Sequence, residues 1–370
     1  MFQKIGKMEN KNVDVFYMEM KKRIREVITI GDEKIEKWIN VYQVAKQMTD
    51  EEIISKQGHQ FDESHYKIIL DEDADVYDED GGLILKLRKK VIPEDLCDTA
   101  VECFRTWSKK FSTNRGASAG LLDKDKLRPG YRAAVDKREE EDKDKKYYGE
   151  RYRANVKRLN KKTGKTSNQS ISNLAPSNIV GYIDSHDRNT KPRPKLPCRL
   201  TAFTKNRVEE WKQSLPFFER CDNVFKALVP SRHATQLAIC SKTPQYQIGN
   251  TAFSTATINS SWRTSCHKDG NDLEEGFGNI VVCEDKKNPM TYKGCYTGFP
   301  QYKICANVRH GDFMAMDVHR WHCNTEFKIS KLKKSDFKSD KQRIEYKNNW
   351  DTNRLSVVMY YRKKMIKCAQ

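Results

Sequence analysis

The sequence predicts an α+β protein with a double-stranded β-helix, or jelly-roll, core and flanking support helices. Many short apolar runs separated by turn signals follow residue 236, a pattern typical of an all-β barrel or sandwich. A strand and an amphipathic helix precede them near residue 90. A His-x-Asp step, a later histidine and an Arg-x-Ser step then occur in the order that a jelly-roll metal site requires.

Residues 1–70 are expected to form a helical N-terminal extension. An amphipathic helix is predicted over 32–48, where a single apolar stripe would pack against the rest of the protein. The residues of this stripe recur at helical spacing: Ile35, Trp38, Ile39, Tyr42 and Ala45. An acidic run over 71–80 then indicates a loop or a boundary.

Residues 71–135 are predicted to form a strand, a helix and a loop. The strand covers 83–87, and Pro93 opens a helix with one apolar face. The glycines of the loop at 114–123 allow close approach of the backbone to a ligand or phosphate, although a plain turn explains them equally well.

Residues 136–175 differ in composition from the rest of the chain. Charged residues dominate and few apolar residues can be buried, so we expect a charged, mobile insertion that is at most partly helical. Its second half is basic, with Tyr147, Tyr148 and Tyr152 interleaved, a pattern that could follow a nucleic-acid backbone. A merely solvated insertion explains the composition equally well.

Residues 176–370 contain the predicted β core. A first strand at 179–183 and a loop at 186–197 precede a helix that begins at residue 206 and is interrupted at Pro216. A charged stretch at 328–353 is expected to be a rim loop. The remaining core strands are predicted at 236–240, 251–259, 263–269, 279–283, 302–308, 313–318 and 354–362.

The charge balance favours a polyanionic partner. The 370 residues include 69 Lys and Arg against 51 Asp and Glu, a net charge of +18. A general enrichment in lysine is the alternative explanation.

The cysteines indicate a reducing compartment. They number 11, an odd count without a C-x-x-C pair, so free thiols are expected rather than a disulfide framework or a zinc finger. The N-terminus has no signal-peptide core, and no run approaches 18 apolar residues. We therefore expect a soluble, intracellular protein without a membrane segment.

The His-x-Asp step indicates a metal centre. In an extended strand, His267 and Asp269 point to the same side, because alternate side chains share a face. Imidazole and carboxylate supply two thirds of the facial triad that holds non-haem Fe(II). The run at 311–322 offers the third ligand, with His319 and His322 as alternatives.

The Arg-x-Ser step suits a dicarboxylate. Strand alternation places Arg354 and Ser356 on one face, and a guanidinium binds a carboxylate through two hydrogen bonds. Taken in order, these motifs describe an Fe(II)- and 2-oxoglutarate-dependent dioxygenase. No P-loop, GxGxxG or nucleophile elbow occurs, which disfavours nucleotide-driven enzymes and hydrolases.

The same motifs resemble the TET and J-binding-protein (TET/JBP) family of Fe(II)/2-oxoglutarate dioxygenases. The resemblance covers roughly residues 80–362 without the insertions, and 1–70 match nothing. It would make 71–135 the N-terminal part and 176–370 the core of a catalytic domain. The matching stretches are Arg-Thr-Ser-Cys-His-Lys-Asp at 263–269, Gly-Phe-Gly-Asn-Ile-Val-Val at 276–282, the run 311–326, Arg-Leu-Ser-Val-Val-Met-Tyr-Tyr at 354–361 and, more weakly, 115–123.

The resemblance implies hydroxylation of the 5-methyl group of 5-methylcytosine or thymine in DNA, in the nucleus or wherever DNA resides. It selects His322 over His319 as the distal ligand, with His267 and Asp269. It implies O2 as a co-substrate and double-stranded DNA, with the base flipped out, as the partner.

Three further residues have expected roles at this site. Arg263 is expected to pair with the metal-side carboxylate of 2-oxoglutarate, an ordinary surface arginine being the alternative. Arg115 and Asp123 are expected to contact the base or the DNA backbone.

Other functions remain open at this point. A 2-oxoglutarate oxygenase acting on protein side chains or on N-methylated bases would use the same metal set. A metal-free jelly roll that only binds nucleic acid would explain the charge but not the ligand pattern.

Overall fold

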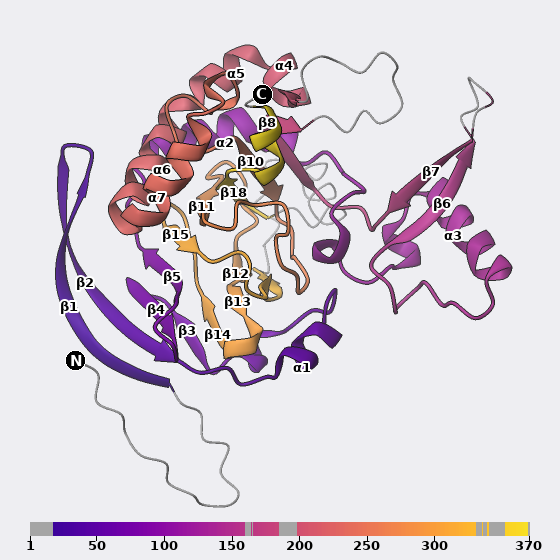
Figure 1. Ribbon diagram of the computed structural model, residues 1–370, viewed down its shortest axis with the longest axis horizontal. Helices are drawn as coiled ribbons and strands as arrows, with labels where there is room; N and C mark the ends of the chain where they lie inside the picture. The colour runs from indigo at the N-terminus through magenta and orange to yellow at the C-terminus, as the bar shows by residue number, and fades with distance from the viewer. Residues whose placement is uncertain are drawn as a thin grey trace, which may run out of the picture.

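The computed structural model describes residues 18–159, 164, 166–184, 198–330, 335, 339 and 352–368. Its central element is a ten-stranded sheet that runs through the middle of the molecule (Figure 1). In spatial order its strands are β1 (Met18–Ile30), β2 (Glu33–Val44), β4 (Ala74–Asp78), β5 (Leu83–Arg88), β15 (Phe313–Met316), β11 (Gly278–Glu284), β18 (Arg354–Tyr360), β10 (Thr255–Ser260), β8 (Ser177–Asp184) and β9 (Cys198–Leu200).

A smaller sheet faces the central strands and completes the jelly roll. The apolar side chains between the two sheets form a continuous core, in which Ile280, Val282 and Met314 of the large sheet meet Phe299 and Ile304 of the small one. The strands of the small sheet are β16 (Cys323–Asn324), β13 (Thr297–Phe299), β14 (Ile304–Ala306) and β3 (Ile68–Leu70), with a separate pair of β12 (Tyr292–Gly294) and β17 (Phe327–Ile329).

Helices cover the other face of the large sheet (Figure 1). Strand alternation sends Val281, Leu355 and Val357 to this side, where they pack with Phe104 and Phe225 of the helices. Pro93 caps the first of these helices, as predicted. The helices of this layer are α2 (Glu94–Ser108), α4 (Ala202–Asn206), α5 (Val208–Gln213), α6 (Leu215–Leu228) and α7 (Pro230–Cys240). The predicted fold class, α+β with a double-stranded β-helix core, is confirmed.

The helix predicted at 32–48 is wrong. The segment is instead β2, which pairs antiparallel with β1 in a long hairpin, and the short helix α1 (Asp50–Ser55) follows. Ile30 pairs with Glu33 across the two-residue turn Gly31-Asp32, and Gly31 adopts a φ of +63°. The β-branched run before this turn is the signal for a strand, and it outweighs the helical spacing of a few apolar residues.

The segment predicted as a mobile insertion has regular structure in its described part. We use the term insertion module for the described residues of 129–171, which include α3 (Pro129–Glu141) and the hairpin of β6 (Ala154–Leu159) and β7 (Thr166–Ile171), seen at the right of Figure 1. Val135, Tyr147, Val156 and Ile171 form a core of its own. The few apolar residues suffice because they meet from one helix and one hairpin. The division of the chain into four parts remains a prediction.

Two predicted strands are also wrong, while the others are found within a few residues. The segment 236–240 ends α7, which begins with Pro230 in the position where proline favours a helix. The segment 263–269 is irregular and makes a single bridge to another loop. The predicted loops at 186–197 and most of 328–353 lie outside the described residues.

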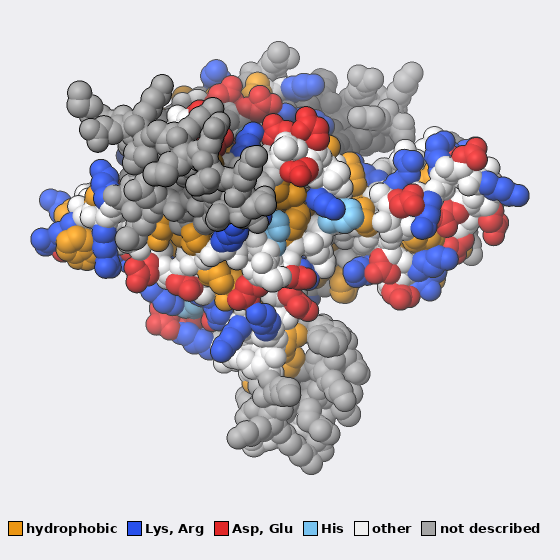
Figure 2. All heavy atoms as spheres, turned by 90° about the horizontal axis from the view of Figure 1, so that it is seen from below, with side chains coloured by type: hydrophobic (Ala, Val, Ile, Leu, Met, Phe, Trp, Pro, Cys, Tyr) orange, Lys and Arg blue, Asp and Glu red, His pale blue; other side chains and the backbone are white. Residues whose placement is uncertain are grey.

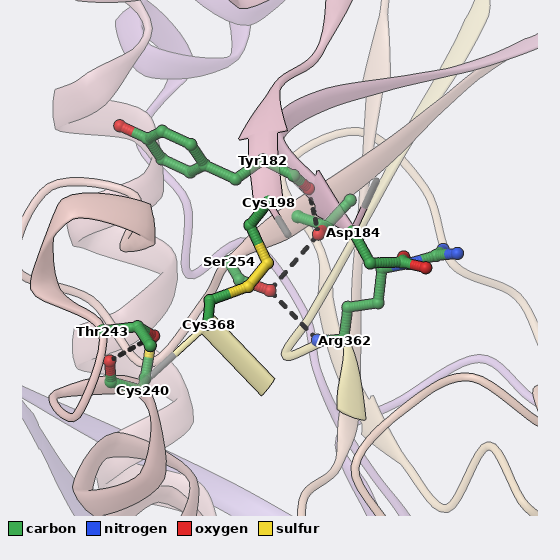
Figure 3. The surroundings of a disulfide bond; sticks show 9 residues. Tyr182, Asp184, Cys198, Cys240, Thr243, Ser254, Arg362 and Cys368 are labelled. Carbon is green, nitrogen blue, oxygen red and sulfur yellow. Dashed lines mark hydrogen bonds and ion pairs between the residues drawn. A yellow bond between two sulfur atoms is a disulfide. The ribbon is translucent and has the colours of Figure 1, made fainter. Parts of the chain in front are cut away.

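One pair of cysteines departs from the predicted free thiols. Cys198 of β9 and Cys368 form a disulfide (Figure 3), and the other nine cysteines are free and buried. The two residues are 170 positions apart, so only the fold brings them together. Among the described helices, none combines the length and apolarity needed to cross a membrane.

Candidate active site

Three predicted metal ligands converge between the sheets. One ligand atom from each of His267, Asp269 and His322 lies within 4.8 Å of the other two. The Nε2 atom of His267 lies 3.6 Å from Oδ1 of Asp269, and Nε2 of His322 lies 3.5 Å from Oδ2. Two imidazoles and one carboxylate on one side of a point form the facial set that suits non-haem Fe(II).

Backbone carbonyls orient both imidazoles. The Nδ1 atom of His267 lies 2.7 Å from the carbonyl of Ser265, and Nδ1 of His322 lies 2.9 Å from that of Arg320. Because Nδ1 donates in each ring, Nε2 keeps its lone pair and faces the carboxylate. This arrangement fits a divalent metal ion, since the ligand atoms are both directed and available.

Two loops supply the ligands, and hydrogen bonds between their backbones join these loops. The amide of His267 donates to the carbonyl of His322, and the amide of His322 donates back, both at 3.0 Å. The amide of Asp269 donates to the carbonyl of Val318 at 3.0 Å. This local bridge gives His267 and Asp269 the common orientation that we expected from a strand.

The electrostatics of the three groups favour a negative carboxylate and a neutral His267. Burial lowers the pKa of His267 to about 4, with the charge of His322 adding to the effect. Burial alone would raise the pKa of Asp269, but His322, His267 and Arg115 lower it to about 2. Burial would likewise lower the pKa of His322, and its contact with Asp269 raises it instead.

Arg354 is a buried cation whose donors are partly unused. Its side chain is 1% exposed, and its Nε and Nη2 atoms have no hydrogen-bond partner among the described residues. Such groups are costly to bury unless an acceptor is supplied. Arg354 shares a face of β18 with Ser356, whose hydroxyl accepts from Nδ2 of Asn259 at 3.3 Å. The pair therefore fits a carboxylate ligand.

A cavity of about 1240 Å³ contains the three metal ligands. Ser356, Val358 and Tyr360 of β18 line it, whereas Arg354 lies one step further along the same strand face. Small-molecule sites usually measure about 300–1000 Å³. The cavity therefore has room for a co-substrate and a second, larger group.

The remaining predicted residues divide into one inside the cavity and two outside it. Arg115 lines the cavity, and its charge lowers the pKa of Asp269. Arg263 instead donates to the carbonyl of Phe61 at 3.0 Å and to Asp62 at 2.6 Å. Asp123 caps a short 3-10 helix by accepting from the amide of Asp125. The structure thus brings neither Arg263 nor Asp123 to the cavity.

Some cavity residues were not identified from the sequence. Asp272 is 7% exposed, and burial raises its pKa well above the usual value, with Asp269 adding to the effect. Asn324 and Thr297 line the inner wall from the small sheet. No spacing rule could have found these residues, because they come from a loop and from short strands.

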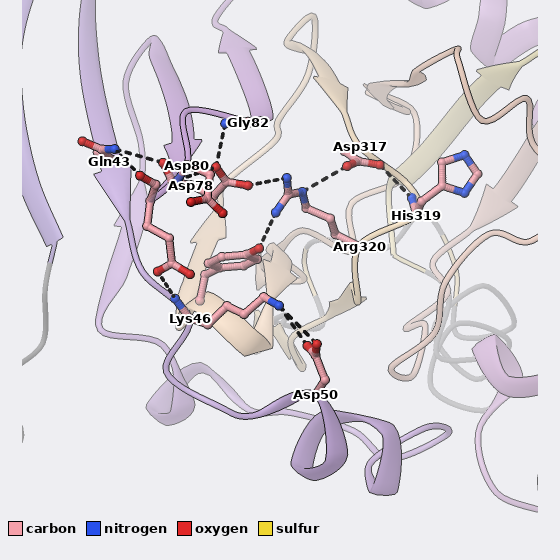
Figure 4. Close-up of polar contacts among 11 residues, drawn as sticks. Gln43, Lys46, Asp50, Asp78, Asp80, Gly82, Asp317, His319 and Arg320 are labelled. Atoms are coloured by element: carbon pink, nitrogen blue, oxygen red, sulfur yellow. Dashed lines mark hydrogen bonds and ion pairs between the residues drawn. The ribbon is translucent and has the colours of Figure 1, made fainter. Parts of the chain in front are cut away.

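A polar cluster around Arg320, drawn in Figure 4, fixes the loop that also carries His322. The guanidinium of Arg320 lies 2.6 Å from Asp78 and 3.0 Å from Asp317, and it also donates to the hydroxyl of Tyr302. The backbone carbonyl of Arg320 accepts a hydrogen bond from Nδ1 of His322. His319 points elsewhere, with Nε2 3.3 Å from the carbonyl of Leu273.

Replacing Arg320 by alanine keeps the carbonyl that orients His322 but removes the ion pairs that fix its loop, so metal binding is expected to weaken by up to about 10-fold, the lower end of the cost of losing a group that supports a ligand. Anaerobic titration with Fe(II) or Mn(II) measures the metal affinity of the variant. Arg220→Ala is the matched control, because Arg220 is also half-buried and ion-paired, 2.8 Å from Glu33, but lies far from the cavity. Equal metal affinity in the two variants would contradict the orienting role.

A family model matches the part of the chain that carries the three ligands and Arg354. Residues 178–363 match the Tet_JBP family model, described as the oxygenase domain of the 2OGFeDO superfamily. A solved structure, NgTET1 in complex with 5mC DNA, covers 87% of this chain and 82% of its own, at 10% identity and a TM-score of 0.41.

Two curated relatives show what the matched region is similar to. Thymine dioxygenase JBP1 of Trypanosoma brucei brucei is 30% identical over 186 residues, which are 50% of this chain and 19% of the relative. The bifunctional helicase and thymine dioxygenase JBP2 of Leishmania major is 32% identical over 149 residues, 40% of this chain and 12% of the relative. The matched region thus spans about a fifth or less of these relatives.

Proposed function

Because the chain belongs to the Tet_JBP family of 2OGFeDO oxygenases, we propose that it hydroxylates the 5-methyl group of thymine or 5-methylcytosine in DNA. The family resemblance noted in the sequence is thereby confirmed. The observation that carries the proposal is the convergence of His267, Asp269 and His322 in a cavity lined by the strand that also carries the buried Arg354. The relatives named thymine dioxygenases support the choice of substrate.

The two histidines and Asp269 would hold Fe(II) through two Nε2 atoms and one carboxylate oxygen. When bound, the iron supplies oxygen activation coupled to the oxidative decarboxylation of 2-oxoglutarate to succinate and CO2. The protein keeps these ligands ready, because the pKa of His267 is low and the carboxylate is ionised. Three coordination positions remain for the co-substrates.

Arg354 and Ser356 would bind the distal carboxylate of 2-oxoglutarate. The Nε and Nη2 atoms that lack partners match the two oxygens of a carboxylate. An acceptor with a full negative charge would neutralise the buried cation, which no described residue does. Arg263 is engaged by Phe61 and Asp62, so we assign it no contact with the co-substrate.

The rest of the cavity would hold the target base, flipped out of a DNA duplex. Its volume exceeds that of a typical small-molecule site, and its wall carries Arg115 and the buried Asp272 as polar groups. We assign Arg115 to the base or to an adjacent phosphate. The net charge of +18 favours association with a polyanion.

Incubation with Fe(II), 2-oxoglutarate and three duplexes tests the proposal. One duplex contains thymine as its only 5-methylpyrimidine, and one contains 5-methylcytosine. The third contains uracil in place of thymine and no methylated base. Nucleoside mass spectrometry should detect a hydroxymethyl pyrimidine from at least one methylated duplex and none from the third. Hydroxylation of a peptide with all three duplexes untouched would overturn the proposal.

A further inference from the structure

The β6–β7 hairpin of the insertion module has one apolar and one basic face. Ala154, Val156 and Ile171 point into the core of the module. Alternation therefore turns the intervening side chains outward, and Asn155 and Lys157 of β6 are exposed, as is Arg153, which immediately precedes this strand. On the neighbouring strand, Asn168 pairs with Lys157 and Ser170 with Asn155, and both are exposed too. The outer face thus consists of cations and small hydrogen-bonding groups.

The charge of this face is not neutralised. The sequence has seven Lys and Arg between 151 and 165, and no Asp or Glu between Glu150 and Asp184. Within the described residues, neither Arg153 nor Lys157 forms an ion pair. On α3 and its flanks, by contrast, the charges pair with one another: Lys124 with Asp136, Arg132 with Asp125, Lys137 and Arg138 with Glu141, Lys145 with Asp142, and Lys146 with Glu150. Figure 2 shows acidic and basic side chains mixed on the face of the module visible at its right.

The outer face of the hairpin continues into the catalytic cavity. Tyr152, Arg153 and Ser170 line the cavity, although they belong to the module. The guanidinium of Arg153 lies against Gly116, where it leaves no room for a side chain, and Gly116 follows Arg115. Arg153 therefore lies both beside the hairpin and at the wall of the cavity.

Two of the three tyrosines near the hairpin, Tyr147 and Tyr148, are engaged within the module and are not free to stack on bases. Tyr147 is 7% exposed and belongs to the core of the module, and the hydroxyl of Tyr148 donates to Asp136 at 3.0 Å. Only Tyr152 of the three lies at the cavity. The face is therefore built for contact with phosphates and sugars rather than with unstacked bases.

We propose that the outer face of the β6–β7 hairpin binds the phosphate backbone of DNA next to the target base. This inference rests on the proposed function. The six residues of β6 extend over about 20 Å, at roughly 3.3 Å per residue. That length corresponds to about six base pairs of duplex. The hairpin thus holds the flanking duplex while the base occupies the cavity, and its contacts carry no sequence preference.

Binding of a 5-methylcytosine or thymine duplex of about 20 base pairs, followed by fluorescence anisotropy at several salt concentrations, tests this proposal. The variant is Arg153→Gln/Lys157→Gln, and the matched control is Lys137→Gln/Lys143→Gln, which removes the same charge from exposed positions on and just after α3. Each phosphate contact contributes about 0.9 to the slope of log affinity against log salt. The hairpin variant should therefore lose about 2 in slope and about tenfold or more in affinity at 0.1 M salt. The control should match the unaltered protein.

Each outcome distinguishes this inference from the proposed function. If the protein oxidises DNA and the hairpin variant binds with unchanged slope and affinity, the hairpin assignment is overturned and the function stands. An equal loss in both double variants would show a general effect of charge and would also overturn it. Tight binding that depends on Arg153 and Lys157, without any oxidation, would support the hairpin and remove the proposed reaction. Thermal unfolding of both variants verifies that they are folded.

Discussion

Replacing His322 by alanine is expected to weaken Fe(II) binding by more than about 100-fold and to reduce succinate formation to background. Loss of a group that only orients a ligand already costs about 10-fold to 100-fold in metal affinity, and His322 contributes a ligand atom itself. Its Nε2 lies 3.5 Å from Asp269, in the group of three ligands. Anaerobic metal titration and a coupled succinate assay measure the two effects.

His319→Ala is the matched control for this prediction. His319 lies three residues away on the same loop, but its Nε2 is 3.3 Å from the carbonyl of Leu273 and not among the three ligand atoms. Metal affinity should stay within about threefold of the unaltered protein, since no ligand is lost. If His319→Ala lost the metal and His322→Ala kept it, the assignment of the distal ligand would be reversed.

Replacing Arg354 by methionine is expected to raise the KM for 2-oxoglutarate by about 100-fold. A hydrogen bond to a charged group contributes about 1.5–3 kcal/mol, so the loss of two such bonds amounts to at least about 3 kcal/mol, or roughly a factor of 100. The unfolding free energy should not fall, because the variant also removes a buried cation whose Nε and Nη2 lack partners. Initial rates at varied 2-oxoglutarate and thermal unfolding measure the two quantities.

Arg88→Met gives the opposite pattern and serves as the control. Arg88 is equally buried in the same sheet, but it pairs with Asp75 at 2.7 Å and with Glu26 at 3.2 Å. Its removal should cost about 3 kcal/mol of stability, as expected when a buried ion pair loses one partner. The KM should not change. If Arg354→Met lowered stability as much as Arg88→Met and left the KM unchanged, Arg354 would have a structural role only.

Local spacing predicted part of the candidate site. His267 and Asp269 share the orientation that the His-x-Asp step predicted, whereas the approach of His322 comes from a bridge between two loops. Arg354 and Ser356 follow from strand alternation, which holds in β18. These relationships extend over two residues or along one strand, and such short-range geometry can be read from spacing.

Contacts between residues far apart in the sequence determined the strands and cavity residues that the sequence did not predict. Helical spacing suggested a helix at 32–48, yet the partner strand β1 decided the structure of that segment. Arg263 precedes the first ligand in the chain, but its guanidinium donates to the carbonyl of Phe61 and is not part of the cavity wall. Cavity residues such as Asp272 and Asn324 come from separate loops, and their proximity depends on the closed fold.

The reciprocal hydrogen bonds between His267 and His322 bear on the stability of the protein without a metal ion. Zinc fingers are unfolded until their ion arrives. Here two backbone hydrogen bonds already join the loops that carry His267 and His322, so a metal ion is not needed to bring these two side chains together. We therefore expect the fold to persist when the metal is removed with a chelator, which thermal unfolding with and without metal would measure.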